Sequence, residues 1–208
     1  MKKLIALLLS CVMALSLVAC GDQKEETPET KPADSATETT DKAEAAGLTE
    51  ALAEYPVLVT SGGQSADYQM IATVMGKKEM TFETNNMATS ADLGDAKTLV
   101  VVVGGSSKGL GAAGIDADGE LDRLTELLDA AKEAGISIIV MHTGGSARRG
   151  DLSDKFIAPI FEYADYAIVV ASGDEDGLMS GICAKNGTPV DMIDSISEVA
   201  TVLPAAFK

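Results

Sequence analysis

Short apolar runs rich in β-branched residues alternate with longer amphipathic runs from Tyr55 to the end of the chain. A parallel sheet whose strands are joined by crossover helices produces this alternation. The apolar runs predict six strands, at Val57–Ser61, Met80–Thr84, Thr98–Val103, Ile136–His142, Tyr166–Ala171 and Pro189–Ile193. The amphipathic runs predict helices over Ala66–Met75, Gly119–Ala134, Leu152–Tyr163, Gly177–Lys185 and Ile196–Ala206.

The third and fourth predicted strands are almost unbroken in apolar residues. This is typical of strands covered on both faces, so we expect them in the middle of the sheet. The helix predicted between them places its leucines on one face and its charges on the other. Residues 55–208 are therefore predicted to form a single doubly wound α/β domain, with a mainly parallel sheet of five to six strands and helices on both faces. Such a domain is Rossmann-like or flavodoxin-like, and the pattern leaves the strand order open.

The N-terminus has the organisation of a signal peptide. Lys2 and Lys3 precede an apolar run from Leu4 to Val18, which is shorter than the roughly 20 residues that a membrane span needs. The sequence from Leu17 to Gly21 resembles the lipobox of bacterial lipoproteins. The resemblance implies cleavage after residue 19 and acylation of Cys20 by diacylglyceryl and palmitate. An ordinary secretory signal with an incidental cysteine, or an uncleaved anchor, is the alternative.

Residues 20–54 are predicted to connect the lipid to the domain. The stretch 21–47 holds eight acidic residues and three lysines and almost no large apolar side chain, so it is expected to be disordered. A helical turn or two is expected over Leu48–Glu54. Two acyl chains hold a protein stably on a membrane. The sequence therefore predicts an extracytoplasmic protein that is lipid-anchored to the bacterial cell membrane.

Composition excludes several classes of partner and cofactor. The chain has 16 Lys and Arg against 32 Asp and Glu, a formal net charge of −16, which disfavours nucleic acid as a partner. Three cysteines and one histidine do not predict a disulfide scaffold or a zinc site. The stretch Asp116–Glu120 is similar to part of a calcium loop but lacks the further oxygen ligands, so it is predicted to cap a helix. We expect no metal and no cofactor.

Loops rich in Gly and Ser follow four of the predicted strands, at 61–65, 104–111, 142–150 and 172–177. Ligands of open α/β sheets bind beyond the carboxyl ends of the strands, and glycines let backbone amides approach them closely. The sequence therefore predicts a binding crevice at this edge, lined by Ser61, Gln64, Ser65, Ser106, Ser107, Lys108, His142, Ser146, Arg148 and Arg149.

Two of the three arginines in the chain, Arg148 and Arg149, are adjacent in one of these loops. A guanidinium group forks onto carboxylate or phosphate, so one of the two is a candidate for binding an anionic ligand. The other is expected to pair with Asp151 or Asp154. Which of the two faces the crevice stays open.

An enzyme is the alternative reading of the same loops. The sequence Gly105–Gly109 fits the G-x-S-x-G pattern around a nucleophilic serine, here Ser107, with His142 downstream as a candidate base. In that pattern the serine leads directly into a helix, whereas we expect this loop to run on through Gly114 to Asp116. Cys183 lies in a helical pattern and is predicted to be a small buried side chain rather than a nucleophile.

Three stretches resemble a family of secreted bacterial α/β proteins classed as a domain of unknown function: Thr60–Asp67, Gly104–Asp116 and Gly144–Gly150. The resemblance covers nearly the whole predicted domain and implies fold and location, but no activity.

The leading hypothesis is an anchored lipoprotein that binds a small anionic or polar ligand, as a sensory or transport-accessory component beside a membrane transporter or sensor. The alternatives are a hydrolase-like enzyme using Ser107 or His142, and a protein-interaction module without a small ligand.

Overall fold

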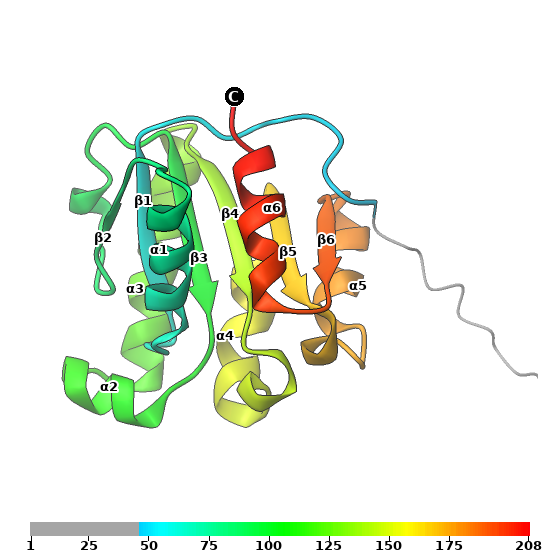
Figure 1. The fold of residues 1–208 in the computed structure, drawn as a ribbon. Helices are drawn as coiled ribbons and strands as arrows, with labels where there is room; N and C mark the ends of the chain where they lie inside the picture. Colours follow the sequence, from blue (N-terminus) through cyan, green and yellow to red (C-terminus); the bar gives the residue numbers. More distant parts are fainter. Residues whose placement is uncertain (1–45) are drawn as a thin grey trace, which may run out of the picture. The chain divides into compact units, whose positions relative to one another are not determined.

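A six-stranded parallel sheet forms the centre of the domain in a computed structural model, which describes residues 46–208 (Figure 1). The strand order is β2-β1-β3-β4-β5-β6. Its first five strands follow the order 2-1-3-4-5 of flavodoxin-like folds. The strands are β1 (Val57–Gly62), β2 (Phe82–Thr84), β3 (Thr98–Val103), β4 (Ser137–His142), β5 (Tyr166–Val170) and β6 (Val190–Ile193).

Helices cover both faces of the sheet. One core cluster joins the sheet to α1 and α6, and the other joins it to α3, α4 and α5. Figure 1 shows α1 and α6 together on the near face and α3, α4 and α5 behind the sheet. The helices are α1 (Asp67–Lys77), α2 (Ser107–Ala113), α3 (Ala117–Glu133), α4 (Asp151–Phe161), α5 (Leu178–Asn186) and α6 (Val199–Ala205).

The two strands predicted for the middle of the sheet are β3 and β4, and they are the central pair. All six residues of β3 are buried, as are the last five of β4. A strand packed against helices on both faces cannot alternate apolar with polar positions, which explains the unbroken apolar runs. The predicted α/β fold, with its parallel sheet and helices on both faces, is confirmed.

The structure differs from the sequence prediction at two helices. The loop expected to run from Gly104 through Gly114 to Asp116 contains α2, whose first residue is Ser107. The Ser106 side chain caps this helix, and Gly114 ends it at a φ of 70°. The helix expected over Ile196–Ala206 begins as a 3-10 turn and becomes α-helical only at Val199. Short helices rich in glycine have weak periodicity, which is why α2 escaped the pattern.

The segment 46–54 crosses the amino edge of the sheet in extended form, without the expected helical turn. Val190 at the start of β6 donates its backbone N–H to Ala46 O over 3.0 Å, and Ala53 donates to Ala206 O over 2.8 Å. Ala53 is completely buried. The chain therefore joins the domain at the edge opposite to the strand-end loops.

The predicted signal peptide 1–19, Cys20 and residues 21–45 of the predicted tether lie outside the described residues. Within residues 46–208, no helix combines the length and the apolar character that a membrane crossing requires.

Candidate binding site at the carboxyl edge of the sheet

The topology reverses between β1 and β3, the second and third strands of the sheet. The chain goes from β1 outward to β2 through α1 on one face, and from β3 to β4 through α2 and α3, of which α3 covers the other face. The loops that follow such neighbouring strands diverge and leave a crevice, which is where doubly wound proteins bind ligands. In this structure the two loops, Gly63–Ala66 after β1 and Gly104–Ser106 after β3, are instead joined by backbone hydrogen bonds, from Ser65 N–H to Gly104 O over 3.2 Å and from Ser106 N–H to Gly63 O over 2.9 Å.

The loop after β1 is held in an uncommon backbone conformation. Gln64 has a φ of 61°, a value that few residues other than glycine adopt. Its side-chain amide bonds to Asn86, donating to the backbone O and accepting from Nδ2, each over 2.9 Å. Its Nε2 also donates to Glu120 Oε1 over 3.0 Å. Gln64 is buried and is thus a support for the loop rather than an open ligand contact.

Glu120 and Arg123 form a buried ion pair beneath this loop. Both residues are in α3, and their side chains are 0% and 7% exposed. Glu120 Oε1 also accepts the backbone N–H of Gly63 over 2.9 Å. Arg123 donates to the backbone oxygens of Ser61 over 2.9 Å and Ala88 over 2.6 Å. The expectation that α3 turns its charges to solvent is wrong at these two positions, because the strand-end loops supply their hydrogen-bond partners.

Sequence reasoning missed Glu120, Arg123 and Asn86 because a Glu and an Arg three residues apart on a helix ordinarily form a solvent-exposed pair. Arg123 is the third arginine of a chain with only three, and that scarcity was the available signal.

Arg148 lies against the start of α1. Its Nε donates to Asp67 Oδ2 over 3.1 Å, and the two side chains are 36% and 9% exposed. Nη1 and Nη2 of Arg148 have no hydrogen-bond partner among residues 46–208. A Cβ at Gly144 would lie 1.9 Å from Arg148 Cγ and 3.0 Å from Asp67 Oδ2, so glycine is required for this approach. Asp67 thus fixes the orientation of the Arg148 guanidinium, whose Nη1 and Nη2 have no partner within residues 46–208. The sequence analysis did not select Asp67.

Arg149 is placed differently from its neighbour. It forms ion pairs with Asp154 over 2.7 Å and Asp176 over 2.8 Å, and Nη1 donates to Gly173 O over 2.5 Å. These bonds raise the pKa of Arg149 and lower that of Asp176 to about 2, in both cases chiefly through the hydrogen bonds between the two side chains. Arg149 thus connects the loop after β4 to the loop after β5. Its Nε, Nη1 and Nη2 all donate hydrogen bonds within the domain, so few N–H groups remain for a ligand.

His142 is fully buried at the end of β4. Its Nδ1 lies 3.1 Å from Val103 O, and its Nε2 lies 3.3 Å from Gly145 O. Burial lowers the pKa of the imidazole below its ordinary value of 6.5. With both ring nitrogens facing backbone carbonyls, His142 holds the β3 and β4 loops together and is not placed to accept a proton from Ser107.

Ser107 is the first residue of α2 and is exposed, as is Lys108 beside it. The G-x-S-x-G stretch therefore does lead into a helix, as the nucleophile pattern requires and contrary to our expectation for this loop. No hydrogen bond to the Ser107 hydroxyl is recorded within the described part of the chain, and the arrangement of His142 does not favour the pairing of the two residues. Ser106 accepts from Gly109 N over 3.0 Å and acts as the helix cap.

The serines of the other loops divide into buried and open ones. Ser61 and Ser65 are completely buried. Ser61 Oγ donates to Ser65 O over 3.2 Å, and Ser65 Oγ accepts from Asp67 N over 3.3 Å. Ser146 is exposed on the loop after β4. Among the described residues, the buried Thr143 Oγ1 has no hydrogen-bond partner. Thr143 is 6% exposed and directly follows His142, at the start of the loop that carries Arg148.

The predicted site residues thus form two layers at the carboxyl edge. Ser107, Lys108 and Ser146 are exposed and Arg148 is partly exposed, whereas Ser61, Gln64, Ser65 and His142 are buried and hold the loops through hydrogen bonds. Within residues 46–208, no three His, Cys, Asp or Glu side chains gather in a way that suits a metal ion. Cys183 is buried in α5, and burial raises the pKa of its thiol to about 11.

Residues 54–207 match a family described as Domain of unknown function (DUF6305). The chain belongs to this family. The match covers the domain from the end of the amino-edge segment to α6 and beyond. No curated protein matches the chain. Among solved structures, the psychrotrophic esterase EstA from a Pseudoalteromonas species is similar over 66% of this chain and 76% of that chain, with a TM-score of 0.31 and 11% sequence identity.

Proposed function

We propose that this chain is a lipid-anchored extracytoplasmic protein whose domain binds a small anionic or polar ligand at the carboxyl edge of the sheet. It would act as a sensory or transport-accessory component beside a membrane transporter or sensor. The observation that carries the proposal is the Arg148 guanidinium, which is fixed at Nε by Asp67 and has no partner at Nη1 or Nη2 within the described residues.

A guanidinium held at one nitrogen presents its other donors in a fixed fork, which suits a carboxylate or phosphate oxygen pair. Arg148 stands at the topological reversal between β1 and β3, where doubly wound folds bind their ligands. Ser107, Lys108 and Ser146 are exposed on the loops and the short helix that follow β3 and β4, and would supply further donors at this edge of the sheet. Such side chains would select a ligand by its charge and its hydrogen-bonding groups rather than by apolar surface.

The lipid anchor rests on the sequence around Cys20. The place where the chain enters the domain is compatible with it, because Ala46 lies beside the first residue of β6, at the amino edge of the sheet. Two acyl chains on Cys20 provide stable attachment without attraction between the acidic protein and anionic lipid.

A thermal-shift screen tests the ligand site. The full chain in detergent is heated with phosphate, sulfate, acetate, citrate and glutamate, each at several concentrations. An anion at about 100 times its Kd adds about 2.7 kcal/mol of stability, which raises the Tm by several degrees for a chain of this size. We expect Arg148→Ala to abolish the shift.

The matched control is Lys132→Ala. Lys132 also makes one ion pair, with Asp165, and its side chain is 40% exposed, but it lies at the end of α3 away from the site. This variant is expected to keep the shift. No shift with any anion, or an equal shift in the Arg148 variant, would contradict the proposed site.

Metabolic labelling tests the anchor. Cells that express the full chain with a palmitate analogue are expected to yield a labelled protein in the membrane fraction. Cys20→Ser should remove the label and block cleavage before residue 20, whereas Cys183→Ser should leave label and cleavage unchanged because Cys183 is buried. An unmodified chain that carries no label would contradict the lipid anchor.

A further inference from the structure

A groove of about 400 Å³ lies at the opposite edge of the sheet from Arg148. It lies beside the first residues of β1, along β2, and against the segment 92–96 that precedes β3. Its floor is apolar, formed by Val57, Leu58, Phe82, Leu93 and Ala96, and its charged lining residues are Glu83, Asp92 and Asp95. None of the residues that line it is Lys, Arg or His.

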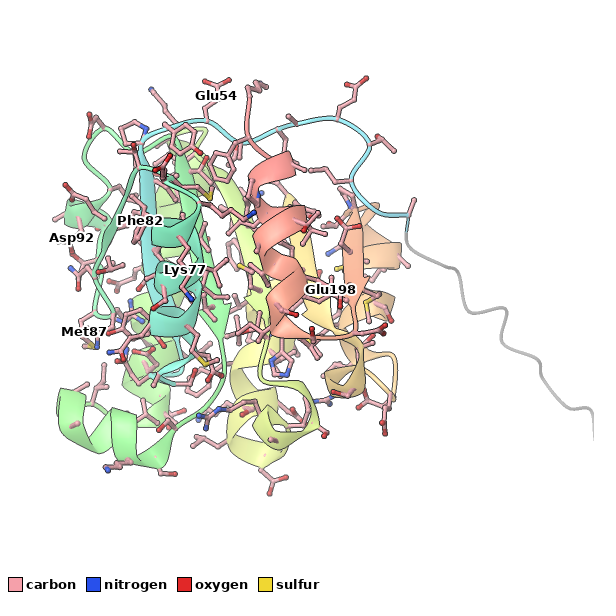
Figure 2. All side chains as sticks on the ribbon, viewed as in Figure 1. Glu54, Lys77, Phe82, Met87, Asp92 and Glu198 are labelled. Carbon is pink, nitrogen blue, oxygen red and sulfur yellow. The ribbon has the colours of Figure 1, made fainter. Side chains whose placement is uncertain are left out.

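β2, which lines the groove, is the edge strand of the sheet. Figure 1 shows β2 at the end of the sheet, with the chain after it turning back beside it. In Figure 2, Phe82 lies on β2 and Asp92 on the returning segment. Asn85 donates its backbone N–H to Val59 O over 3.0 Å, which fixes the alternation of backbone groups along β2.

By this alternation, the backbone groups of Glu83 face β1, and those of Phe82 and Thr84 face outward. No hydrogen bond is recorded for the Phe82 or Thr84 amides within residues 46–208. An edge strand with free backbone groups is a template for another strand, and proteins limit such pairing with short strands, charged side chains, lysine above all, and proline. β2 is short, with three residues, and its one charge is that of Glu83. It carries neither lysine nor proline.

The charges at the groove select the partner. Glu83 and Asp95 form no ion pair with the rest of the described domain, and Asp92 is fixed by the Thr89 backbone N–H and hydroxyl over 2.7 and 2.8 Å. Three carboxylates over an apolar floor attract a chain that combines basic and apolar side chains. The acidic segment 21–47 of this chain, with eight carboxylates against three lysines, has the wrong charge to occupy the groove.

We propose that this groove is a docking site for an extended basic segment of a partner protein, which adds as a strand beside β2. Backbone hydrogen bonds to Phe82 and Thr84 would give affinity, the apolar floor would take one side chain, and Glu83 and Asp95 would bind lysine or arginine. This site shares no residue with the proposed ligand site. It gives the protein a means of engaging a second protein while the carboxyl edge stays open.

Two labelled peptides test the proposal on the full chain in detergent by fluorescence anisotropy. The first is a pentapeptide that alternates lysine with valine, and the second alternates glutamate with valine. We expect the basic peptide to bind more tightly than the acidic one by about tenfold or more at low salt. Equal binding of the two peptides, or no binding of the basic one, would overturn the proposal.

Variants separate the two parts of the interaction. Thr84→Pro removes an outward N–H without removing a bond to β1, so the domain should keep its Tm while the basic peptide binds about tenfold more weakly. Glu83→Gln with Asp95→Asn should weaken the basic peptide about fivefold. The control is Asp122→Asn with Glu126→Gln, which neutralises two exposed carboxylates on α3 and should leave binding unchanged.

Two further measurements distinguish this site from other outcomes. Arg148→Ala should bind the basic peptide as the unmodified chain does, so a failed anion screen and a failed peptide experiment are separate results. Benzylamine, a small organic cation, should not compete with the basic peptide at equal concentration. Full competition by benzylamine, with Thr84→Pro without effect, would overturn strand addition and indicate a small-molecule pocket.

Discussion

Glu120 Oε1 accepts a hydrogen bond from Arg123 Nη2 over 2.8 Å, and the same oxygen accepts the backbone N–H of Gly63 over 2.9 Å. One carboxylate thus joins a buried arginine of the same helix to the loop that follows β1. The pair lies beneath the loop after β1, and its hydrogen bonds to Ser61, Gly63 and Gln64 hold that loop in place.

Removal of the Glu120 carboxylate should destabilise the protein strongly. Glu120→Ala leaves the Arg123 charge buried without its partner, and breaking a buried pair costs about 3–5 kcal/mol. Chemical denaturation of the full chain measures this loss. Glu126→Ala, on the exposed face of the same helix, should change the free energy of unfolding by less than about 0.5 kcal/mol. Similar effects of the two substitutions would show that the pair does not support the fold.

The two adjacent arginines should contribute unequally to the stability of the protein. Arg149→Ala removes two ion pairs and the bond to Gly173 O, and we expect it to destabilise the protein by about 1–2 kcal/mol. Arg148→Ala removes a single ion pair, between the partly exposed Arg148 and the buried Asp67, so we expect a smaller loss of about 1 kcal/mol. Thermal and chemical denaturation of both variants without ligand make the comparison. Arg148 as the more destabilising position would contradict the structural role of Arg149.

The stability of the protein should fall as the pH is lowered through the range of histidine. His142 is the only histidine, and burial lowers its pKa below 6.5 in the folded state. Below pH 6.5 the unfolded chain therefore binds a proton that the folded chain does not, and the free energy of unfolding decreases. Above pH 6.5 this contribution is fully present.

Chemical denaturation at pH 7.5, 6.5 and 5.5 measures this dependence, and His142→Asn should flatten it. Carboxyl groups such as Asp92 and Asp176, whose pKa values are lowered by hydrogen bonds, act only at lower pH. An unfolding free energy that is constant between pH 7.5 and 5.5 in the unmodified chain would show that His142 is not held neutral.

A fluorophosphonate probe should not label Ser107. The hydroxyl is exposed at the start of α2, but both nitrogens of His142 lie against backbone carbonyls, so no imidazole is placed to activate it. Mass spectrometry of the treated full chain locates any adduct, and heat-denatured chain serves as the background control. Stoichiometric labelling that Ser107→Ala abolishes would favour the enzyme hypothesis over the ligand-binding one.

The pattern of apolar residues was sufficient for the fold class. In β3 and β4, burial on both faces confines polar side chains to the strand ends, at Thr98, Ser137 and His142, so the apolar runs between them indicate the central location of both strands. The pattern does not record the strand order. Which strands become neighbours depends on packing between segments far apart in the chain, and each crossover helix looks the same in sequence whichever face it covers.

The sequence by itself also determined that serine, histidine and arginine gather at the carboxyl edge, because parallel strands bring all their following loops to one side. Only the tertiary structure decided their roles. Arg148 and Arg149 are neighbours in the same loop, yet one meets Asp67 from α1 and the other meets Asp154 and Asp176 from two different segments. The role of a charged side chain is set by the partners that fold around it, and those partners are distant in sequence.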